Sequence, residues 1–143
     1  MSRRNIRPAG WSAPSGYENG VHVPPGRSLL FVAGQIAWDG EKRLVGAGDF
    51  AAQFRQALSN VLEVVRHAGG TGQDLVALTI YVTDKRQYLD ATRQLGALWR
   101  ELIGASWPTM ALVEVRGLLE QGALIEIQGI AAIDCQVPSS GHE

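Results

Sequence analysis

Trp107-Pro108-Thr109-Met110 stands directly before a strand-like run, Ala111-Leu112-Val113-Glu114-Val115, and a second such run follows it, Ala123-Leu124-Ile125-Glu126-Ile127-Gln128-Gly129-Ile130-Ala131. Because successive side chains of a strand point to opposite faces, the second run divides into two sets. Leu124, Glu126, Gln128 and Ile130 lie on one side, and Ile125, Ile127, Gly129, Ala131 and Ile133 on the other. Both sets contain apolar residues. If helices cover one side only, the other side is predicted to contact another subunit.

The remaining sequence predicts strands and helices in alternation. Strand-like runs occupy residues 21–23, 28–36 and 75–83, besides the two near 110–115 and 124–133. Apolar residues spaced by three and four predict a helix that Asp49 caps and Gly69-Gly70 ends. A second helix is predicted from about Lys85 to Ile103. The predicted order is β-β-α-β-α-β-β, an α+β fold with a mixed sheet and two helices packed on one face.

The chain is predicted to form a single domain over residues 1–143. Residues 1–19 lack periodicity and predict an irregular lead-in, in which Arg3, Arg4 and Arg7 are interpreted as a solvated end rather than a binding arm. Residues 136–143 form a polar tail. Within the apolar run 28–36, Gly34 predicts a β-bulge or a close approach of two backbones.

Composition excludes several classes of function. A net charge of -1 supplies no positive field for nucleic acid, and no apolar run is long enough to span a membrane. Cys135 is the only cysteine, so no intramolecular disulfide can form, and a reducing compartment is expected. The basic residues near the N-terminus are not followed by the apolar stretch of a secretory signal peptide, so we expect a cytoplasmic protein. The histidines are not spaced for metal binding, and no cofactor or metal is expected; they are His22, His67 and His142.

Several segments, in the same order, resemble the RidA/YjgF/UK114 family. The resemblance covers residues 15–133 and is carried by Phe31-Val32-Ala33-Gly34-Gln35-Ile36, Ser59-Asn60-Val61-Leu62, Thr79-Ile80-Tyr81-Val82-Thr83-Asp84 and the stretch 108–131. It implies the chorismate-mutase-like fold of that family and a homotrimer with small-molecule pockets between subunits. Deaminating members hydrolyse reactive enamines and imines.

The resemblance also implies a set of site residues. Tyr17 matches a pocket tyrosine, and Glu126 matches a glutamate on the last strand. Gly34 and Gln35 match a Ser-Gly-Gln turn, but Ala33 stands where that turn has serine. Two further positions depart from the pattern, because Gly96 replaces an asparagine and Met110 replaces the arginine that clamps the substrate carboxylate. Trp107 and Gln128 complete the expected binding set, with Trp107 and Met110 as an apolar wall.

These substitutions change the expected chemistry. Glu126 is predicted to be catalytic, because a carboxylate can position water and shuttle its protons. Methionine offers neither charge nor donor, so deamination of 2-imino acids is disfavoured unless Arg100 or Arg116 supplies the missing cation. The pocket suits a neutral or cationic, partly apolar ligand such as an amine, amide or enamine. From the residues alone, Glu126 could equally be an interfacial ion-pair partner, and Met110 could be ordinary core.

Three functions therefore remain. The favoured one is a small-molecule hydrolase or deaminase acting on an enamine, an imine or a related amine or amide. The alternative is a non-catalytic, metabolite-binding regulatory trimer, which the loss of polar residues at Ala33, Gly96 and Met110 favours. RNA cleavage, an activity attributed to some family members, would require a basic groove and aromatic platforms, and neither is visible in the sequence.

Overall fold

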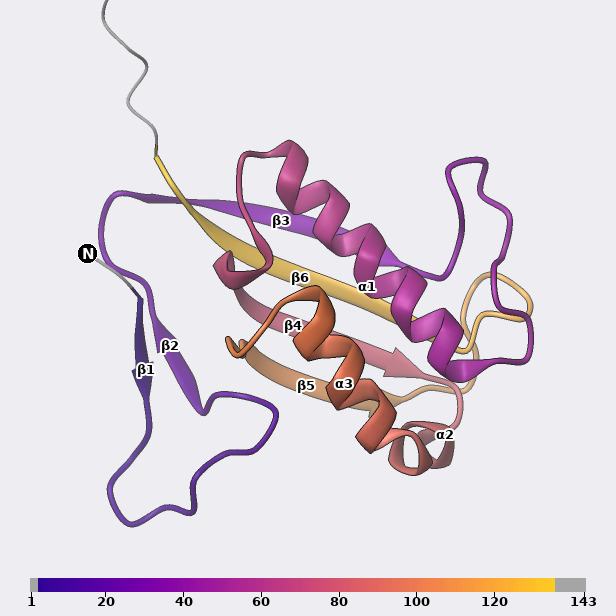
Figure 1. Cartoon of the computed structure of the whole chain (residues 1–143), viewed down its shortest axis with the longest axis horizontal. Coiled ribbons are helices and arrows are strands. Elements are labelled where there is room, and N and C mark those ends of the chain that lie inside the picture. The colour runs from indigo at the N-terminus through magenta and orange to yellow at the C-terminus, as the bar shows by residue number, and fades with distance from the viewer. Residues whose placement is uncertain (1–2, 136–143) are drawn as a thin grey trace, which may run out of the picture.

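A computed structural model describes residues 3–135 of the chain. Four strands form the main sheet, β3 (Arg27–Gln35), β4 (Leu75–Val82), β5 (Thr109–Glu114) and β6 (Ile125–Asp134), in the order β3-β6-β4-β5 (Figure 1). The pairs β3–β6 and β6–β4 are antiparallel, whereas β4–β5 is parallel. The prediction of a mixed sheet is confirmed. The polar tail predicted at residues 136–143, with His142, lies outside the described residues.

Helices cover one face of this sheet (Figure 1). They are α1 (Phe50–His67), α2 (Lys85–Asp90) and α3 (Thr92–Leu102), and a short 3-10 helix, η1 (Gly72–Asp74), precedes β4. Asp49 caps α1 as predicted, accepting a hydrogen bond from the Ala52 N–H at 3.1 Å. Gly69 follows α1 with φ +90°, a conformation that favours glycine and that ends the helix.

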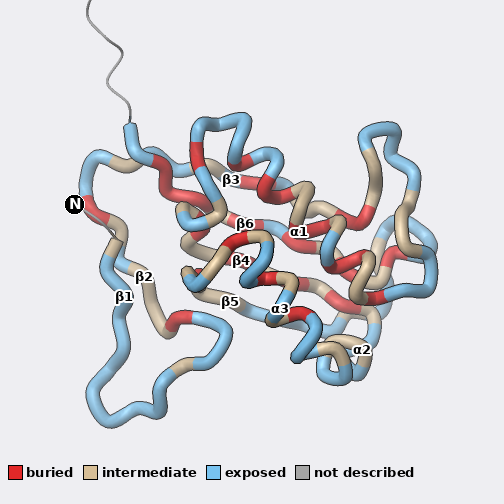
Figure 2. Tube along the Cα trace, in the orientation of Figure 1, coloured by how far each residue is buried: buried red, intermediate tan, exposed pale blue. Residues whose placement is uncertain are grey.

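The core lies between the helices and the sheet, as the buried segments in Figure 2 show. On β6, Ile125, Ile127 and Ala131 are fully buried at 0% exposure, which confirms that this set of alternating residues faces the helices. The opposite face of the sheet is open, and Leu29, Phe31 and Val113 are 57%, 70% and 41% exposed. The homotrimer stays a prediction, one that this apolar face favours.

The second predicted helix is two helices. The backbone breaks at Ala91, with φ -100° and ψ 3°, between α2 and α3. Thr92 follows the break, and its hydroxyl donates to the Leu89 carbonyl at 3.0 Å. A local bond from threonine to the backbone competes with helical hydrogen bonding. The continuous apolar pattern from Lys85 to Ile103 therefore concealed an interruption, and residues 3–135 contain three α-helices rather than the two predicted.

The predicted irregular lead-in contains a strand. Within residues 1–19, β1 (Arg4–Ile6) pairs with β2 (Gly20–His22) in an antiparallel ribbon beside the main sheet (Figure 1). Arg3 donates to the carbonyls of Leu75, at 2.7 Å, and Trp107. The interpretation of the arginine cluster as a solvated end is thus wrong for Arg3, because contacts far apart in sequence anchor this segment. No helix within residues 3–135 is long and apolar enough to cross a membrane.

Candidate functional site

A cavity of about 480 Å³ lies on the helix-covered side of the sheet. It opens between α3, strand β5 and the loop before β2. Four of the predicted site residues line it, namely Tyr17, Gly96, Trp107 and Met110. Its other walls are Ser15, Gly16, Phe54, Ile80, Tyr88, Thr92, Leu95, Trp99, Arg100 and Leu112.

The register of β5 determines which of its side chains enter the cavity. In the parallel pair with β4, Met110 lies opposite Leu78 and Leu112 opposite Ile80. Leu78 and Ile80 are core residues, so Met110 and Leu112 point toward the helices. Trp107, just before β5, stacks on Trp99 of α3 with ring centroids 4.8 Å apart. The Trp99 indole donates to the Ser106 carbonyl at 3.0 Å, which holds this aromatic wall in place.

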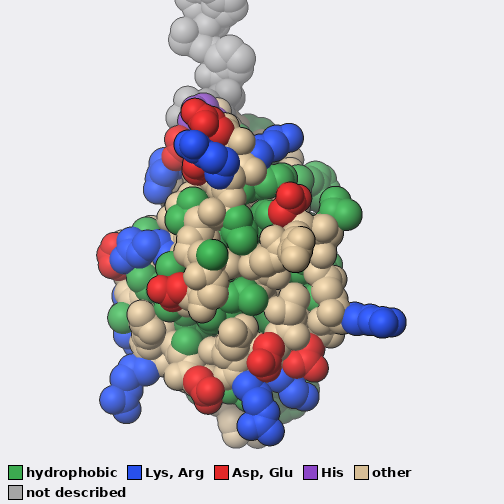
Figure 3. All heavy atoms as spheres, turned by 90° about the vertical axis from the view of Figure 1, so that its right-hand side faces the viewer, with side chains coloured by type: hydrophobic (Ala, Val, Ile, Leu, Met, Phe, Trp, Pro, Cys, Tyr) green, Lys and Arg blue, Asp and Glu red, His purple; other side chains and the backbone are tan. Residues whose placement is uncertain are grey.

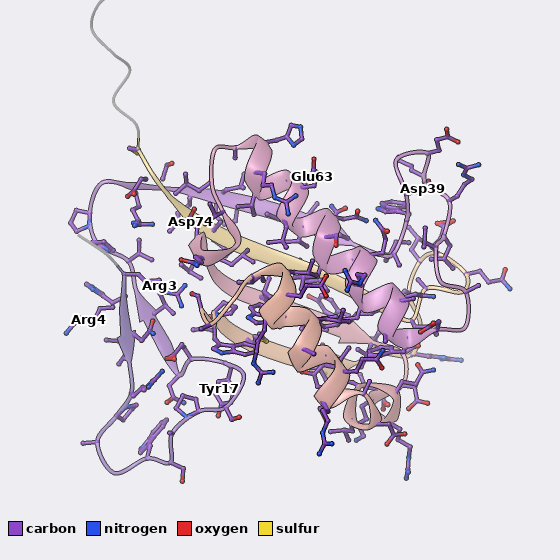
Figure 4. All side chains as sticks on the ribbon, in the orientation of Figure 1. Arg3, Arg4, Tyr17, Asp39, Glu63 and Asp74 are labelled. Carbon is purple, nitrogen blue, oxygen red and sulfur yellow. The ribbon has the colours of Figure 1, made fainter. Side chains whose placement is uncertain are left out.

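Tyr17 lies in the loop just before β2, on the part of that loop nearest the main sheet in Figure 4. The next residue, Glu18, is 3% exposed, and its backbone N–H donates to the Pro108 carbonyl at 2.9 Å. Arg7 forms a bidentate ion pair with the Glu18 carboxylate. These contacts fasten the loop that carries Tyr17 to the chain just before Met110. Sequence reasoning missed Glu18, whose only signal was its position beside the aligned tyrosine.

A second group of predicted residues meets on the open face of the sheet. The pairing of β3 with β6 shifts between Val32 and Gln35, which confirms the predicted β-bulge at Ala33-Gly34. Glu126 lies against this bulge, because a Cβ added to Gly34 would stand 2.6 Å from the Glu126 Oε2 atom. The absence of a side chain at Gly34 therefore creates the space that the carboxylate occupies.

The remaining two predicted residues adjoin this group. Gln35 turns its amide back to the Ala33 carbonyl at 3.2 Å. Gln128 is exposed on the open face and accepts a hydrogen bond from the Tyr81 hydroxyl at 2.9 Å. The bulge, Glu126 and Gln128 thus form a compact polar patch.

The structure places these two groups on opposite faces of the sheet. Glu126 lies opposite Tyr81 in the β4–β6 pairing, and Tyr81 lies opposite Val113 of β5. Met110 is three residues before Val113 and therefore points to the other face. Within one chain, Glu126 does not line the cavity that contains Tyr17 and Met110.

Charge and protonation further define the cavity. Arg100 is the only side chain with a formal charge among the lining residues, which all fall within residues 3–135. Arg116 does not line the cavity. Burial raises the pKa of the Tyr88 phenol, so this wall residue stays neutral at physiological pH. Residues 3–135 contain no cluster of three or more His, Cys, Asp or Glu side chains that could hold a metal ion.

Comparison with known proteins identifies the family. A family model described as endoribonuclease L-PSP matches residues 11–133. A RutC family protein of Pyrococcus horikoshii is 33% identical over 104 residues, which cover 73% of this chain and 79% of the relative. The crystal structure of a Rid family protein of unknown function from Yersinia pestis is 36% identical with a TM-score of 0.80, covering 93% of this chain and 100% of that one.

The YjgF protein of E. coli is also similar. It is 30% identical with a TM-score of 0.65, and the match covers 90% of this chain and 98% of the solved one. This chain belongs to the RidA/YjgF family. The expected resemblance is confirmed, and with it the fold of the family.

Proposed function

We propose that this RidA/YjgF protein is a hydrolase that deaminates enamines, imines or related amines and amides, in a pocket completed where two copies meet. The observation that carries the proposal is the fit between Gly34 and Glu126, in which a missing side chain makes room for a carboxylate on the open face. A structural ion pair would not require that space, and no Lys or Arg within residues 3–135 lies within salt-bridge distance of Glu126. Partly buried and without an ion-pair partner in the described part of the chain, Glu126 can bind and activate water.

A second copy resolves the separation of the two groups. The open face is apolar around Leu29, Phe31 and Val113, which favours its burial against another subunit. If that subunit presents its cavity rim to this face, Glu126 of one chain meets Tyr17 and Met110 of another. The site would then need at least two copies of the chain, and the family resemblance implies a trimer.

The reaction needs no cofactor. The oxygen of water adds to the electrophilic C=N carbon while the Glu126 carboxylate accepts a proton from it. Glu126 passes this proton to the nitrogen, which gives a carbinolamine. The carboxylate then accepts the hydroxyl proton as the C=O bond forms and the C–N bond breaks, and the departing nitrogen takes up that second proton, so a carbonyl compound and ammonia or an amine are released. An enamine first becomes the imine by protonation at carbon. The half-buried carboxylate is thus both base and acid.

The cavity also bears on the substrate. Met110 places a thioether where a clamp for an α-carboxylate would require an arginine, and the stacked Trp99 and Trp107 add an apolar wall. An α-carboxylate held at Met110 would lose water without gaining a cation from β5, and Arg100, the one charged side chain that lines the cavity within residues 3–135, comes from α3 instead. Deamination of 2-imino acids is therefore disfavoured, whereas an apolar or aromatic body is well accommodated.

Non-catalytic binding of a metabolite by a regulatory trimer is the second candidate. The small residues Ala33 and Gly96 favour it, because they remove polar groups expected at the bulge and in the cavity. RNA cleavage is not favoured. On the face shown in Figure 3, Lys and Arg side chains are interspersed with Asp and Glu and form no basic stripe.

The deciding experiment is hydrolysis of 2-iminobutanoate, generated in situ by a threonine dehydratase and followed as release of 2-oxobutanoate. We expect wild type to be nearly inactive on this α-imino acid. Met110→Arg should gain activity, because the charge-assisted bonds of a guanidinium to a carboxylate contribute about 1.5–3 kcal/mol each.

A further variant distinguishes catalysis from binding. Met110→Arg combined with Glu126→Gln should bind 2-oxobutanoate as Met110→Arg does, yet release no product. Strong activity of wild type would show that another cation clamps the carboxylate and that Met110 does not exclude the substrate. An inactive Met110→Arg variant that still binds 2-oxobutanoate would support the regulatory trimer instead.

A further inference from the structure

Arg100 stands out among the residues of the cavity. It lies in the last turn of α3, and it is the only charged side chain in a lining that otherwise consists of aromatic, aliphatic, glycine and hydroxyl residues from the described part of the chain. No acidic side chain from residues 3–135 lines the cavity, so the guanidinium gives this lining a net positive charge. An anionic group entering from solvent would meet this cation without opposition from a carboxylate.

The Arg100 guanidinium lies beside Gly96. Gly96 lies one turn before Arg100 on α3, and a Cβ added there would stand 3.9 Å from the Arg100 Nη1 atom. The Arg100 side chain therefore extends back along the helix over Gly96 and remains at the cavity wall. A longer side chain at position 96, such as the expected asparagine, would compete for the same space.

Arg100 also forms no ion pair within residues 3–135. No carboxylate within residues 3–135 lies within salt-bridge distance of it, whereas the neighbouring Glu101 pairs with Arg55 at 2.7 Å. Glu101, the acidic residue next to Arg100 in the sequence, is therefore already paired on the outer face of the helices. The five donors of the Arg100 guanidinium remain available to a ligand.

The walls near Arg100 indicate what that ligand carries besides its charge. Arg100 comes from α3, and Met110 and Leu112 come from β5, with the Trp99–Trp107 stack among the walls. An acid group at Arg100 would thus be bound by α3, whereas the family's arginine, at the position of Met110, would bind an α-carboxylate from β5. The apolar residues Trp107, Met110 and Leu112 line the same cavity and offer a surface for an apolar part of the ligand.

We propose that Arg100 selects the substrate by binding a carboxylate that is separated from the reacting C=N group by an apolar or aromatic body. This assignment deepens the proposed hydrolase function and rests on it for the nature of the reacting group. It replaces the expectation of a neutral or cationic ligand, and it does not restore the 2-imino acid as substrate, because in such acids the carboxylate adjoins the C=N carbon.

Binding can be tested apart from turnover with a matched pair of probes, 3-phenylpropanoate and its neutral amide 3-phenylpropanamide, by titration calorimetry at low ionic strength. Wild type should bind the carboxylate about tenfold more tightly than the amide, the range for a charge-assisted bond at a partly exposed site. Arg100→Gln should bind both equally, and Arg100→Lys should keep part of the preference. Arg93→Gln, an exposed position of the same helix outside the cavity lining, should behave as wild type. Equal binding of the two probes by wild type, or binding of neither, would overturn the assignment, as would a preference that survives in Arg100→Gln.

Turnover separates this assignment from the proposed function. The methylamine imines of 4-formylbenzoate and 4-formylbenzamide differ only in the remote charge, and their hydrolysis can be followed by rapid mixing. Arg100→Gln should raise KM about tenfold for the carboxylate substrate alone, with kcat unchanged, whereas Glu126→Gln should lower kcat for both. If wild type hydrolyses neither imine but shows the Arg100-dependent preference in binding, hydrolysis fails and the anion site stands. If it hydrolyses both equally, the anion site fails and hydrolysis stands.

Discussion

Gly34 and Glu126 occupy neighbouring strands, and one has no side chain where the other places its carboxylate. Gly34→Ala would put a Cβ 2.6 Å from Glu126 Oε2, so the carboxylate must move. The backbone at Gly34 has no positive φ, so alanine should fold there, at a cost of about 1 kcal/mol for displacing the Glu126 side chain. We expect kcat for imine hydrolysis to fall at least about tenfold, because a displaced base loses alignment with its water.

The control for this variant is Gly40→Ala. Gly40 also lacks a positive φ, and a Cβ there would meet nothing within 4 Å. It should leave both kcat and the melting temperature unchanged. Full activity in Gly34→Ala, with its fold intact by circular dichroism, would show that the position of Glu126 is not critical to turnover.

The sequence allowed some of these single-residue features to be predicted, but not others. The bulge at Gly34 was foreseen because a glycine inside an apolar strand commonly marks a bulge or a close backbone approach. Gln53 was not foreseen, although it is fully buried in the apolar face of α1. Its amide donates to the carbonyls of Gly46 and Gly122 and accepts from the Leu124 N–H. Partners in distant loops leave no local signal in the sequence.

At the scale of elements, long-range contacts decide what the sequence leaves open. Helix α1 and the strands of the main sheet followed from local periodicity, and their bounds agree closely with the predictions, whereas the break between α2 and α3 did not. The β1–β2 ribbon did not, since Arg3 reaches the carbonyls of Leu75 and Trp107 on another part of the chain. The separation of Glu126 from Met110 could not be predicted from local periodicity either. Alternation assigns faces within each strand, but the parallel register of β5 with β4 is needed to relate one strand to the other.

We expect Arg3 to hold the β1–β2 ribbon, and with it Tyr17, against the main sheet. Burial lowers the pKa of the Arg3 guanidinium, but arginine stays protonated in proteins, so its bonds to the carbonyls of Leu75 and Trp107 persist at neutral pH. Arg3→Ala should free the ribbon locally, increasing amide hydrogen exchange at Val21 and His22 about tenfold and raising KM more than it lowers kcat.

Arg4 offers a matched control, because Figure 4 shows Arg3 directed toward the sheet and Arg4 away from it. Arg4→Ala removes the same charge without removing those bonds, and it should leave exchange and KM as in wild type. Equal exchange in the two variants would mean that β1–β2 pairing alone holds the ribbon.

At the scale of the whole molecule, two groups on opposite faces of one sheet cannot act on one substrate unless different copies contribute them. This reasoning predicts complementation between two inactive variants. Glu126→Gln removes the carboxylate but leaves the cavity intact, and Met110→Trp fills the cavity but leaves the carboxylate intact. Each homotrimer should be inactive on the imine of 4-formylbenzoate.

Mixed trimers should regain activity. When the two variants are unfolded together and refolded in equal amounts, a site between neighbouring subunits has about one chance in four of receiving both intact halves, so about a quarter of wild-type activity should return. Mixing the variants without subunit exchange provides the control and should give none. If refolded mixtures stay inactive while sedimentation shows trimers, each chain must build its whole site alone, and the carboxylate that serves the cavity must then be one other than Glu126.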